Sequence, residues 1–302
     1  MLGYAVIDVE TTGFHANGTD RVVEVAVVQV DPGGAVEEEW HTLLNPHRDM
    51  GPQHIHRIRA AEAAAAPTFD QIMGHLVDRL AGRVLVAHNL PFDVRFIDAE
   101  FRRAGVRAPV VEAPGLCTME LSDQYLFADG RSLTACAQAA GISHVDAHMA
   151  LADAHTAAAL LRHCLRCAEP GAAWTSFYRR AASAPWLGVI PAHRTAREAH
   201  RRPVAHRTPP HQIDAASTRA VRLPLGSSIV LTGQMRYSRE EYVEMAERAG
   251  FRVAERVTKK VDAVVAADPD SLSGKARRAR QYGIPVISEE SFGALLSQPL
   301  PT

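Results

Sequence analysis

Residues 4–13 are Tyr4-Ala5-Val6-Ile7-Asp8-Val9-Glu10-Thr11-Thr12-Gly13, an apolar run interrupted by two carboxylates. Because successive side chains of a β-strand point to opposite faces, residues two positions apart share a face, and Asp8 and Glu10 point the same way. Placing two like charges side by side on a buried strand is unfavourable unless a cation neutralises them. The pair therefore predicts a divalent metal.

The sequence around this run predicts an α/β domain. Three apolar runs separated by turn residues, at residues 3–9, 22–30 and 36–44, favour an antiparallel meander. A short buried strand is expected over Val84–Ala87. Helical patterns cover residues 68–80, 91–104, 119–127, 133–140 and 148–167. Strands flanked by helices predict a layered α/β domain that ends near residue 168.

Two further acids and a histidine complete a chemical set. Asp93 follows the buried strand, in the first turn of a helix, and Asp153 lies in the long helix, five residues after His148. Five residues turn an α-helix by about 500°, so the two side chains would not align if both were helical. We therefore expect His148 at or before the start of that helix, free to reach the site that Asp153 faces.

The set of four acids and one histidine suits phosphoryl chemistry. Mg²⁺ prefers oxygen ligands and keeps several waters. Two such ions about 4 Å apart can stabilise both the attacking and the leaving oxygens of an in-line displacement. A histidine, which titrates near neutral pH, can take a proton from the attacking water. Taken singly, Asp93 could be a helix cap and Asp153 an ordinary helix-start acid. Their joint occurrence favours the catalytic interpretation.

The order Asp-x-Glu, His-Asn…Phe-Asp, His-x-x-x-x-Asp resembles the DEDD 3′–5′ exonuclease superfamily in its His-containing (DEDDh) branch. That branch includes the epsilon proofreading subunit of bacterial replicative polymerases and ribonuclease T. Three further segments are similar to elements of that family: Ile55-His56-Arg57-Ile58, Ala66-Pro67-Thr68-Phe69 and Cys117-Thr118-Met119-Glu120-Leu121-Ser122. The resemblance covers about residues 1–168 and implies a ribonuclease H-like mixed sheet with flanking helices.

The resemblance also implies roles for particular residues. Two Mg²⁺ ions are expected, with Mn²⁺ able to substitute, and His148 would be the general base. Backbone groups near Thr11, Thr12 and Gly13 would contact the terminal nucleotide. His88 and Asn89 either contact substrate or cap the turn, and the cap is favoured. The metal ligands implied are Asp8, Glu10, Asp93 and Asp153.

Charge is distributed unevenly along the 302 residues. Residues 1–169 hold 13 Lys and Arg against 22 Asp and Glu, and residues 170–222 hold 9 against 2. Six prolines in the second stretch predict a linker over residues 169–220. Its positive charge fits binding to a polyanion or, equally well, an arginine-rich genome. Aromatic residues predict that residues 172–188 dock on the first domain or on a partner.

Order returns at Leu223 with a predicted βαββαβα pattern: strands over 228–232, 252–257, 263–266 and 286–287, and helices over 238–249, 274–282 and 289–296. Val230-Leu231-Thr232-Gly233, Ser273-Gly274-Lys275 and Glu289-Glu290-Ser291-Phe292 resemble a BRCT domain over residues 221–298, most similar to those of bacterial NAD-dependent DNA ligases and of the clamp loader's large subunit. Thr232, Gly233 and Lys275 could cradle one phosphate group. The alternative is a tight turn beside a solvated lysine.

These features favour a metal-dependent 3′–5′ exonuclease that acts on single-stranded 3′ ends of DNA and releases nucleoside 5′-monophosphates, in repair or proofreading. The first alternative is an exoribonuclease, and the second is a BRCT scaffold of a repair complex. A DNA polymerase or repair protein is the expected partner of the BRCT domain. No apolar run spans a membrane, and the four cysteines do not suggest a zinc site or a disulfide framework, which favours a cytoplasmic, nucleoid-associated protein.

Overall fold

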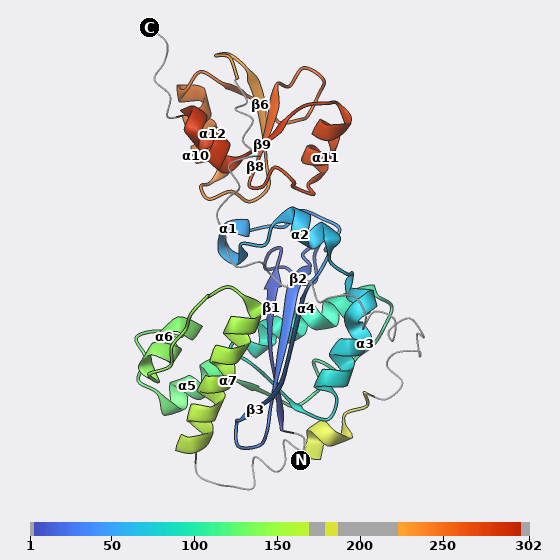
Figure 1. Ribbon diagram of the computed structural model, residues 1–302, viewed down its shortest axis with the longest axis vertical. Coiled ribbons are helices and arrows are strands. Elements are labelled where there is room, and N and C mark those ends of the chain that lie inside the picture. The colour runs from blue at the N-terminus through green and yellow to red at the C-terminus, as the bar shows by residue number, and fades with distance from the viewer. Residues whose placement is uncertain (1–2, 169–178, 187–222, 297–302) are drawn as a thin grey trace. The chain divides into compact units, whose positions relative to one another are not determined.

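The structure, a computed structural model, describes residues 3–168, 179–186 and 223–296 (Figure 1). The chain divides into two compact units, residues 1–45 with 66–206 and residues 46–65 with 207–302. The predicted domain boundaries fall at or inside segments outside the described residues, and they stay predictions.

A mixed five-stranded sheet forms the centre of the first unit, which confirms the predicted α/β class. Its order is β3-β2-β1-β4-β5. The first three strands are antiparallel, and β4 and β5 continue the sheet in parallel with β1. The strands are β1 (Tyr4–Thr11), β2 (Val22–Val30), β3 (Val36–Leu43), β4 (Val84–Ala87) and β5 (Gly115–Cys117). β5 was not predicted from the sequence, because it has only three residues.

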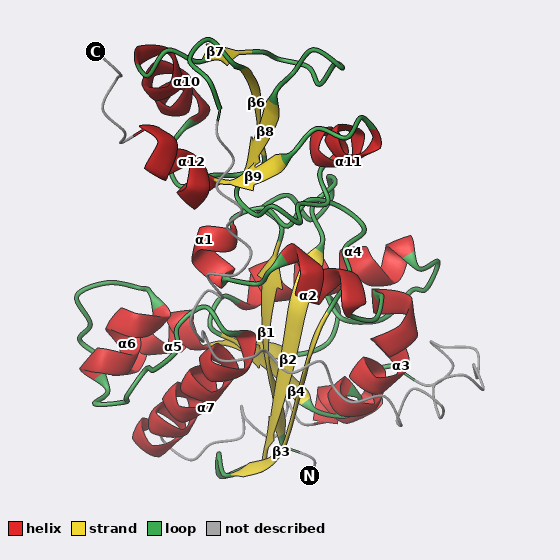
Figure 2. Ribbon diagram, turned by 45° about the horizontal axis from the view of Figure 1, so that its top comes forward, coloured by secondary structure: helices red, strands yellow, loops and turns green. Residues whose placement is uncertain are grey.

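Helices cover both faces of this sheet (Figures 1 and 2). They are α3 (Phe69–Leu80), α4 (Leu90–Arg103), α5 (Thr118–Tyr125), α6 (Leu133–Ala139) and α7 (Ala150–Cys167). All five lie where the sequence predicts helices. The last begins two residues later than predicted, which leaves His148 in the preceding loop, as its spacing from Asp153 requires.

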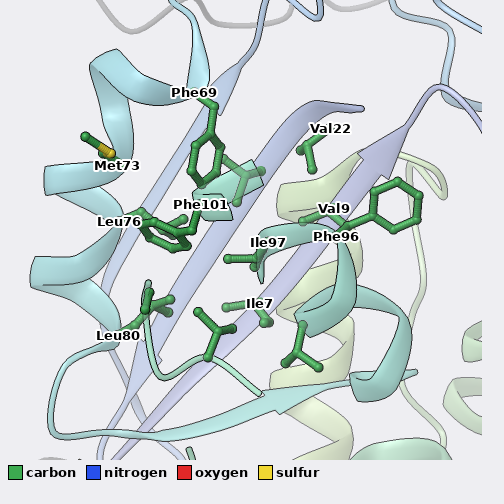
Figure 3. Close-up of a cluster of buried hydrophobic side chains, with 14 of the residues drawn as sticks. Ile7, Val9, Val22, Phe69, Met73, Leu76, Leu80, Phe96, Ile97 and Phe101 are labelled. Atoms are coloured by element: carbon green, nitrogen blue, oxygen red, sulfur yellow. The ribbon is translucent and has the colours of Figure 1, made fainter. Parts of the chain in front are cut away.

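The alternation of β1 separates two hydrophobic cores. Ile7 and Val9 point into the core that α3 and α4 cover, where Phe96 and Phe101 are also buried (Figure 3). Tyr4 and Val6 point to the opposite face, into the core against α7. Asp8 and Glu10 continue the second series, so they emerge on the α7 side at the end of the strand.

The aromatic docking segment predicted for residues 172–188 is described only over residues 179–186. Within it, Trp186 is 5% exposed and belongs to the core between the sheet and α3 and α4. Ala181 is buried in the core against α7. Whether the remainder of the segment docks stays a prediction.

The second unit has a parallel four-stranded sheet in the order β7-β6-β8-β9. Its elements beyond residue 223 are β6 (Ser228–Thr232), α10 (Arg239–Arg248), β7 (Arg252–Val253), β8 (Ala263–Ala266), α11 (Gly274–Gln281), β9 (Val286–Ser288) and α12 (Glu289–Leu296). The same unit includes α1 (Gln53–His56) and α2 (Ala60–Ala65). The predicted βαββαβα order is confirmed.

One predicted strand of this unit was too long. β7 was expected over residues 252–257 but covers only Arg252 and Val253. It is an edge strand and pairs with β6 at Ser228 and Ile229 alone. Residues 255 and 256 are exposed, so no second strand or core holds them in an extended conformation.

Among the described residues, no helix is long and apolar enough to cross a membrane.

Candidate functional site

The carboxyl end of β1 places two predicted metal ligands. Asp8 and Glu10 are partly accessible to solvent, whereas Ile7 and Val9 on the other face are buried. In the register of the sheet, Asp8 pairs with Ala26 and Glu10 with Glu24 of β2. Both side chains therefore point to the face of the sheet on which α7 packs.

Asp93 reaches this point because β4 is shorter than β1. Pairing between the two strands ends at Val6, so the edge of β1 beyond it has no strand on that side. The amide of Val9 donates a hydrogen bond to Oδ1 of Asp93 across 3.2 Å. Asp93 lies in the first turn of α4 and is 4% exposed. The first turn of α4 thus brings a third carboxylate to the level of Asp8 and Glu10.

Helix α7 and the loop before it provide the remaining two residues. Asp153 lies in the first turn of α7, and His148 lies one residue before the N-cap with a positive φ of 68°. A carboxylate oxygen of Glu10, a ring nitrogen of His148 and a carboxylate oxygen of Asp153 lie within 4.8 Å of one another. Two segments far apart in the sequence, the end of β1 and the start of α7 with its preceding loop, therefore present metal-ligating atoms at one place.

The electrostatics of the cluster call for a cation. Burial raises the pKa of Asp8 well above its usual range, and the charges of Asp93, Glu10, Asp153 and Glu24 raise it further. Burial also raises the pKa of Asp93 to about 8, although hydrogen bonds from backbone amides oppose this shift. Each of these carboxylates destabilises the charged form of its neighbours. An oxygen-rich donor set with uncompensated negative charge fits a hard divalent ion.

The sequence itself decides the family. A sequence model of the exonuclease family matches residues 5–161, and a model of the BRCT (BRCA1 C Terminus) domain matches residues 222–296. The chain belongs to the exonuclease family. Its second matched region is a BRCT domain, so both resemblances are confirmed, and assignment to the His-containing branch stays a prediction.

Relatives of this exonuclease-family chain act in bacterial DNA metabolism, to judge by their names. A DNA polymerase III subunit epsilon-like protein of Rhodobacter capsulatus is 35% identical over 168 residues, which are 53% of this chain and 23% of that protein. The DNA polymerase III subunit epsilon of Pasteurella multocida is 29% identical over 161 residues, 49% of this chain and 62% of that one. The chain thus spans under two thirds of the length of these relatives.

Among solved structures, E. coli Exonuclease I in complex with a dT13 oligonucleotide aligns with a TM-score of 0.47 and 19% identity. The alignment covers 53% of this chain and 40% of that protein.

The turn after β1 of the exonuclease-family chain is held by its own side chains. The hydroxyl of Thr11 donates to the carbonyl of Gly13 at 2.7 Å, and that of Thr12 donates to Asp20 Oδ1 at 3.3 Å. A Cβ on Gly13 would lie 2.5 Å from Oδ2 of Asp20. The turn is therefore rigid, and Gly13 is needed for the close approach of Asp20. Contact of these three residues with a nucleotide stays a prediction.

For His88 and Asn89 the sequence left two roles open, contact with substrate and capping of the turn. Both ring nitrogens of His88 have partners in the chain, the Thr118 hydroxyl at 3.0 Å and the Arg131 carbonyl at 2.8 Å. Because a carbonyl only accepts, Nε2 carries the proton and Nδ1 accepts from Thr118. Burial lowers the pKa of His88. Asn89 occupies the N-cap position of α4 without a side-chain capping bond.

A fifth carboxylate, Glu24, was not predicted from the sequence. Glu24 is 1% exposed near the start of β2, opposite Glu10. Its Oε2 accepts a hydrogen bond from the amide of Ala150, the first residue of α7, at 3.3 Å, and its Oε1 lies 3.7 Å from Nδ1 of His41. Glu24 therefore ties the start of α7 to the sheet. The sequence signal for Glu24 was its position as the single charged residue in the otherwise apolar run of residues 22–28.

Phe14 was also missed. Its side chain is 73% exposed directly after Gly13, and its ring makes an edge contact with Phe92, with the ring centroids 6.4 Å apart. Phe92 lies beside Asp93 at the start of α4. An exposed aromatic ring next to a predicted nucleotide contact is a platform on which a base can stack.

The BRCT domain gathers its predicted site residues at the end of β6. The hydroxyl of Thr232 donates to Ser273 Oγ at 3.0 Å, and Nζ of Lys275 donates to the Leu231 carbonyl at 3.2 Å. Gly233 has a φ of 83°, which only glycine adopts readily. Arg239 donates to the same Leu231 carbonyl at 3.2 Å. Burial and then the charge of Arg239 lower the pKa of Lys275.

Proposed function

We propose that the chain is a metal-dependent 3′–5′ exonuclease that removes nucleoside 5′-monophosphates from single-stranded 3′ ends of DNA. The observation that carries the proposal is the convergence of Glu10, His148 and Asp153 within 4.8 Å, beside Asp8 and Asp93. These residues come from β1, α4 and the start of α7 with its preceding loop, and the acids among them raise the pKa of Asp8, which a bound cation would offset. The name of one relative, the 3′-5′ exonuclease DinG of Bacillus subtilis, supports the direction of cleavage.

The residues of the site would have three roles: holding metal, accepting a proton and orienting the nucleotide. Asp8, Glu10, Asp93 and Asp153 would hold two Mg²⁺ ions, or Mn²⁺ in their place. When bound, the ions supply positive charge at the attacking and leaving oxygens of an in-line displacement. His148 is exposed in the loop before α7 and would accept the proton of the attacking water. The rigid turn from Thr11 to Gly13 and the ring of Phe14 would orient the terminal nucleotide.

The BRCT domain would recruit the exonuclease to the site where it acts. Thr232, Gly233 and Lys275, joined by Arg239, offer a hydroxyl, a backbone amide and two cations at the end of β6, a set that suits a phosphate group. That phosphate would belong to a DNA end or to a polymerase or repair protein. We accordingly expect a cytoplasmic protein associated with the nucleoid.

A degradation assay tests the catalytic proposal. The full chain is incubated with Mg²⁺ and a 5′-labelled single strand of DNA, and we expect a ladder of products shortened from the 3′ end. Asp8→Asn and Asp153→Asn should abolish the ladder, whereas Asp98→Asn, an acid on α4 paired with Arg102, should not. A wild-type chain without a ladder, or an unchanged ladder in Asp153→Asn, would overturn the proposal.

A second assay tests the substrate. Matched single strands of DNA and RNA are degraded side by side, and faster loss of RNA would replace DNA by RNA as substrate.

A binding assay tests the phosphate site. Binding of duplexes with and without a 5′-phosphate is compared in the wild type and Lys275→Met. A phosphate-dependent gain that the variant loses supports the site at β6, and equal binding of both duplexes contradicts it.

A further inference from the structure

Asp153 is held on both of its oxygens by the loop that precedes α7. Nε2 of His144 lies 2.7 Å from Oδ1, and the amide of His148 donates to Oδ2 across 3.2 Å. The side chain of His144 is 5% exposed and that of Asp153 is 13% exposed. A short contact between nearly buried groups fixes the rotamer of the carboxylate more firmly than an exposed ion pair would.

The ring of His144 is itself fixed from behind. Oγ1 of Thr134, near the start of α6, lies 3.0 Å from Nδ1 of His144. A carboxylate oxygen only accepts, so Nε2 must carry a proton, and in the neutral ring Nδ1 then accepts the hydroxyl proton of Thr134. Both contacts are therefore satisfied by one tautomer. The chain Thr134–His144–Asp153 links α6, the loop and α7.

The loop between His144 and Asp153 has an unusual backbone. Asp146 and His148 both have positive φ, 57° and 68°, although neither is glycine. Such conformations persist only where the surroundings hold them, and they gather at functional sites. The bonds from His144 and from the His148 amide to the two oxygens of Asp153 are among the contacts that hold this loop, together with the bond from the Met149 amide to the Asp146 carbonyl.

We propose that His144 is a positioning residue of the metal site, which acts by orienting the carboxylate of Asp153 and is itself set by Thr134. The proposal rests on the proposed function, because Asp153 must be a metal ligand. Carboxylates that bind metals are themselves hydrogen-bonded, and loss of such an outer partner typically weakens metal binding about 10- to 100-fold. In this role His144 acts through Asp153, by deciding where the lone pairs of that carboxylate point.

The test is direct titration of the full metal-free chain with Mn²⁺, without nucleic acid, followed by calorimetry or by the electron paramagnetic resonance of the free ion. His144→Ala should weaken Mn²⁺ binding about 10- to 100-fold. His144→Gln, whose amide N–H stands where Nε2–H stood, should restore most of the affinity. Thr134→Val, equal in shape but without the hydroxyl, should weaken binding to a smaller extent.

His155→Ala is the matched control. His155 lies on α7, the helix that carries Asp153, and its exposed ring lies 2.7 Å from Glu39 Oε2 on β3. Its Mn²⁺ affinity should equal that of the wild type. Thermal unfolding in EDTA shows which variants fold, and His144→Gln keeps the test decisive if His144→Ala does not.

The outcomes separate this inference from the proposed function. Wild-type Mn²⁺ affinity in His144→Ala, or equal weakness of His144→Ala and His144→Gln, would overturn the positioning role even if the wild type degrades DNA. If the wild type binds Mn²⁺ tightly, His144→Ala weakly and His144→Gln well, the positioning role stands even if no variant degrades DNA.

Discussion

The amide of Val9 donates a hydrogen bond to Oδ1 of Asp93 across 3.2 Å, between a sheet edge that β4 leaves open and the first turn of α4. This bond places Asp93 beside Asp8 and Glu10. It also satisfies a backbone donor that would otherwise be buried without a partner. The same residue thus completes the fold at the end of β1 and supplies a carboxylate to the candidate metal site.

Asp93→Asn should make the metal-free protein less sensitive to pH. Burial raises the folded-state pKa of Asp93 to about 8, above the usual 3.8, so the folded state keeps a proton that the unfolded chain releases. The resulting stability is full below the unfolded pKa and is lost as the pH rises through the folded one. Asn does not titrate and can still accept the bond from Val9.

Thermal unfolding in EDTA from pH 5 to pH 9 measures this effect. The melting temperature of the wild type should fall more steeply with pH than that of Asp93→Asn, and the variant should be the more stable above pH 8. Asp98→Asn, on the same helix, should behave as the wild type. Parallel pH profiles for wild type and Asp93→Asn would contradict the pKa shift.

Divalent metal should stabilise the protein more at pH 8 than at pH 6. A ligand that binds only the folded state at 100 times its Kd stabilises by about 2.7 kcal/mol. Because metal binds ionised carboxylates, and the pKa values of Asp8 and Asp93 are raised, binding competes with protons at low pH. Melting temperatures with and without saturating Mn²⁺ provide the measurement. An equal gain at both pH values would show that these two acids do not hold the metal.

Glu24 should contribute to stability through its bond to α7 and to the site through its charge. Glu24→Ala leaves the buried amide of Ala150 without this acceptor and should lower the free energy of unfolding by about 1–3 kcal/mol in urea titrations. Glu24→Gln retains an acceptor but removes a charge near Asp8, so it should unfold nearly as the wild type and bind Mn²⁺ more weakly. Glu37→Gln, on exposed β3, controls for charge alone. If Glu24→Ala unfolded like the wild type, Glu24 would not be what holds the start of α7 to the sheet.

Phe14→Ala should weaken substrate binding without slowing the chemical step. Stacking of one base on an aromatic ring contributes about 1–3 kcal/mol, which predicts a KM for single-stranded DNA raised about 5- to 150-fold with kcat nearly unchanged. Phe14→Trp should keep a low KM. Val36→Ala removes an exposed apolar side chain at the opposite end of the sheet and serves as control. A loss in kcat alone would place Phe14 elsewhere in the reaction.

Local patterns were sufficient for most of the fold. The apolar runs that form β1, β2 and β3 and the helical patterns of α3 and α7 carry their own periodicity, and their bounds differ from expectation by at most two residues. β5 and the length of β7 were not accessible in this way. A strand of two or three residues has no measurable period, and its extent depends on which neighbour it pairs with.

The sequence by itself determined the family and the α/β class, and it predicted the candidate site residues Asp8, Glu10, Asp93, His148 and Asp153, because each stands in a local motif and the motifs follow in one order. Only the tertiary structure decided which groups support them. Glu24, His144 and Phe14 belong to no motif, and their roles come from contacts of 2.7 to 6.4 Å between segments up to 126 residues apart. Such contacts arise only when the sheet and its helices pack, so the sequence alone does not show which groups meet.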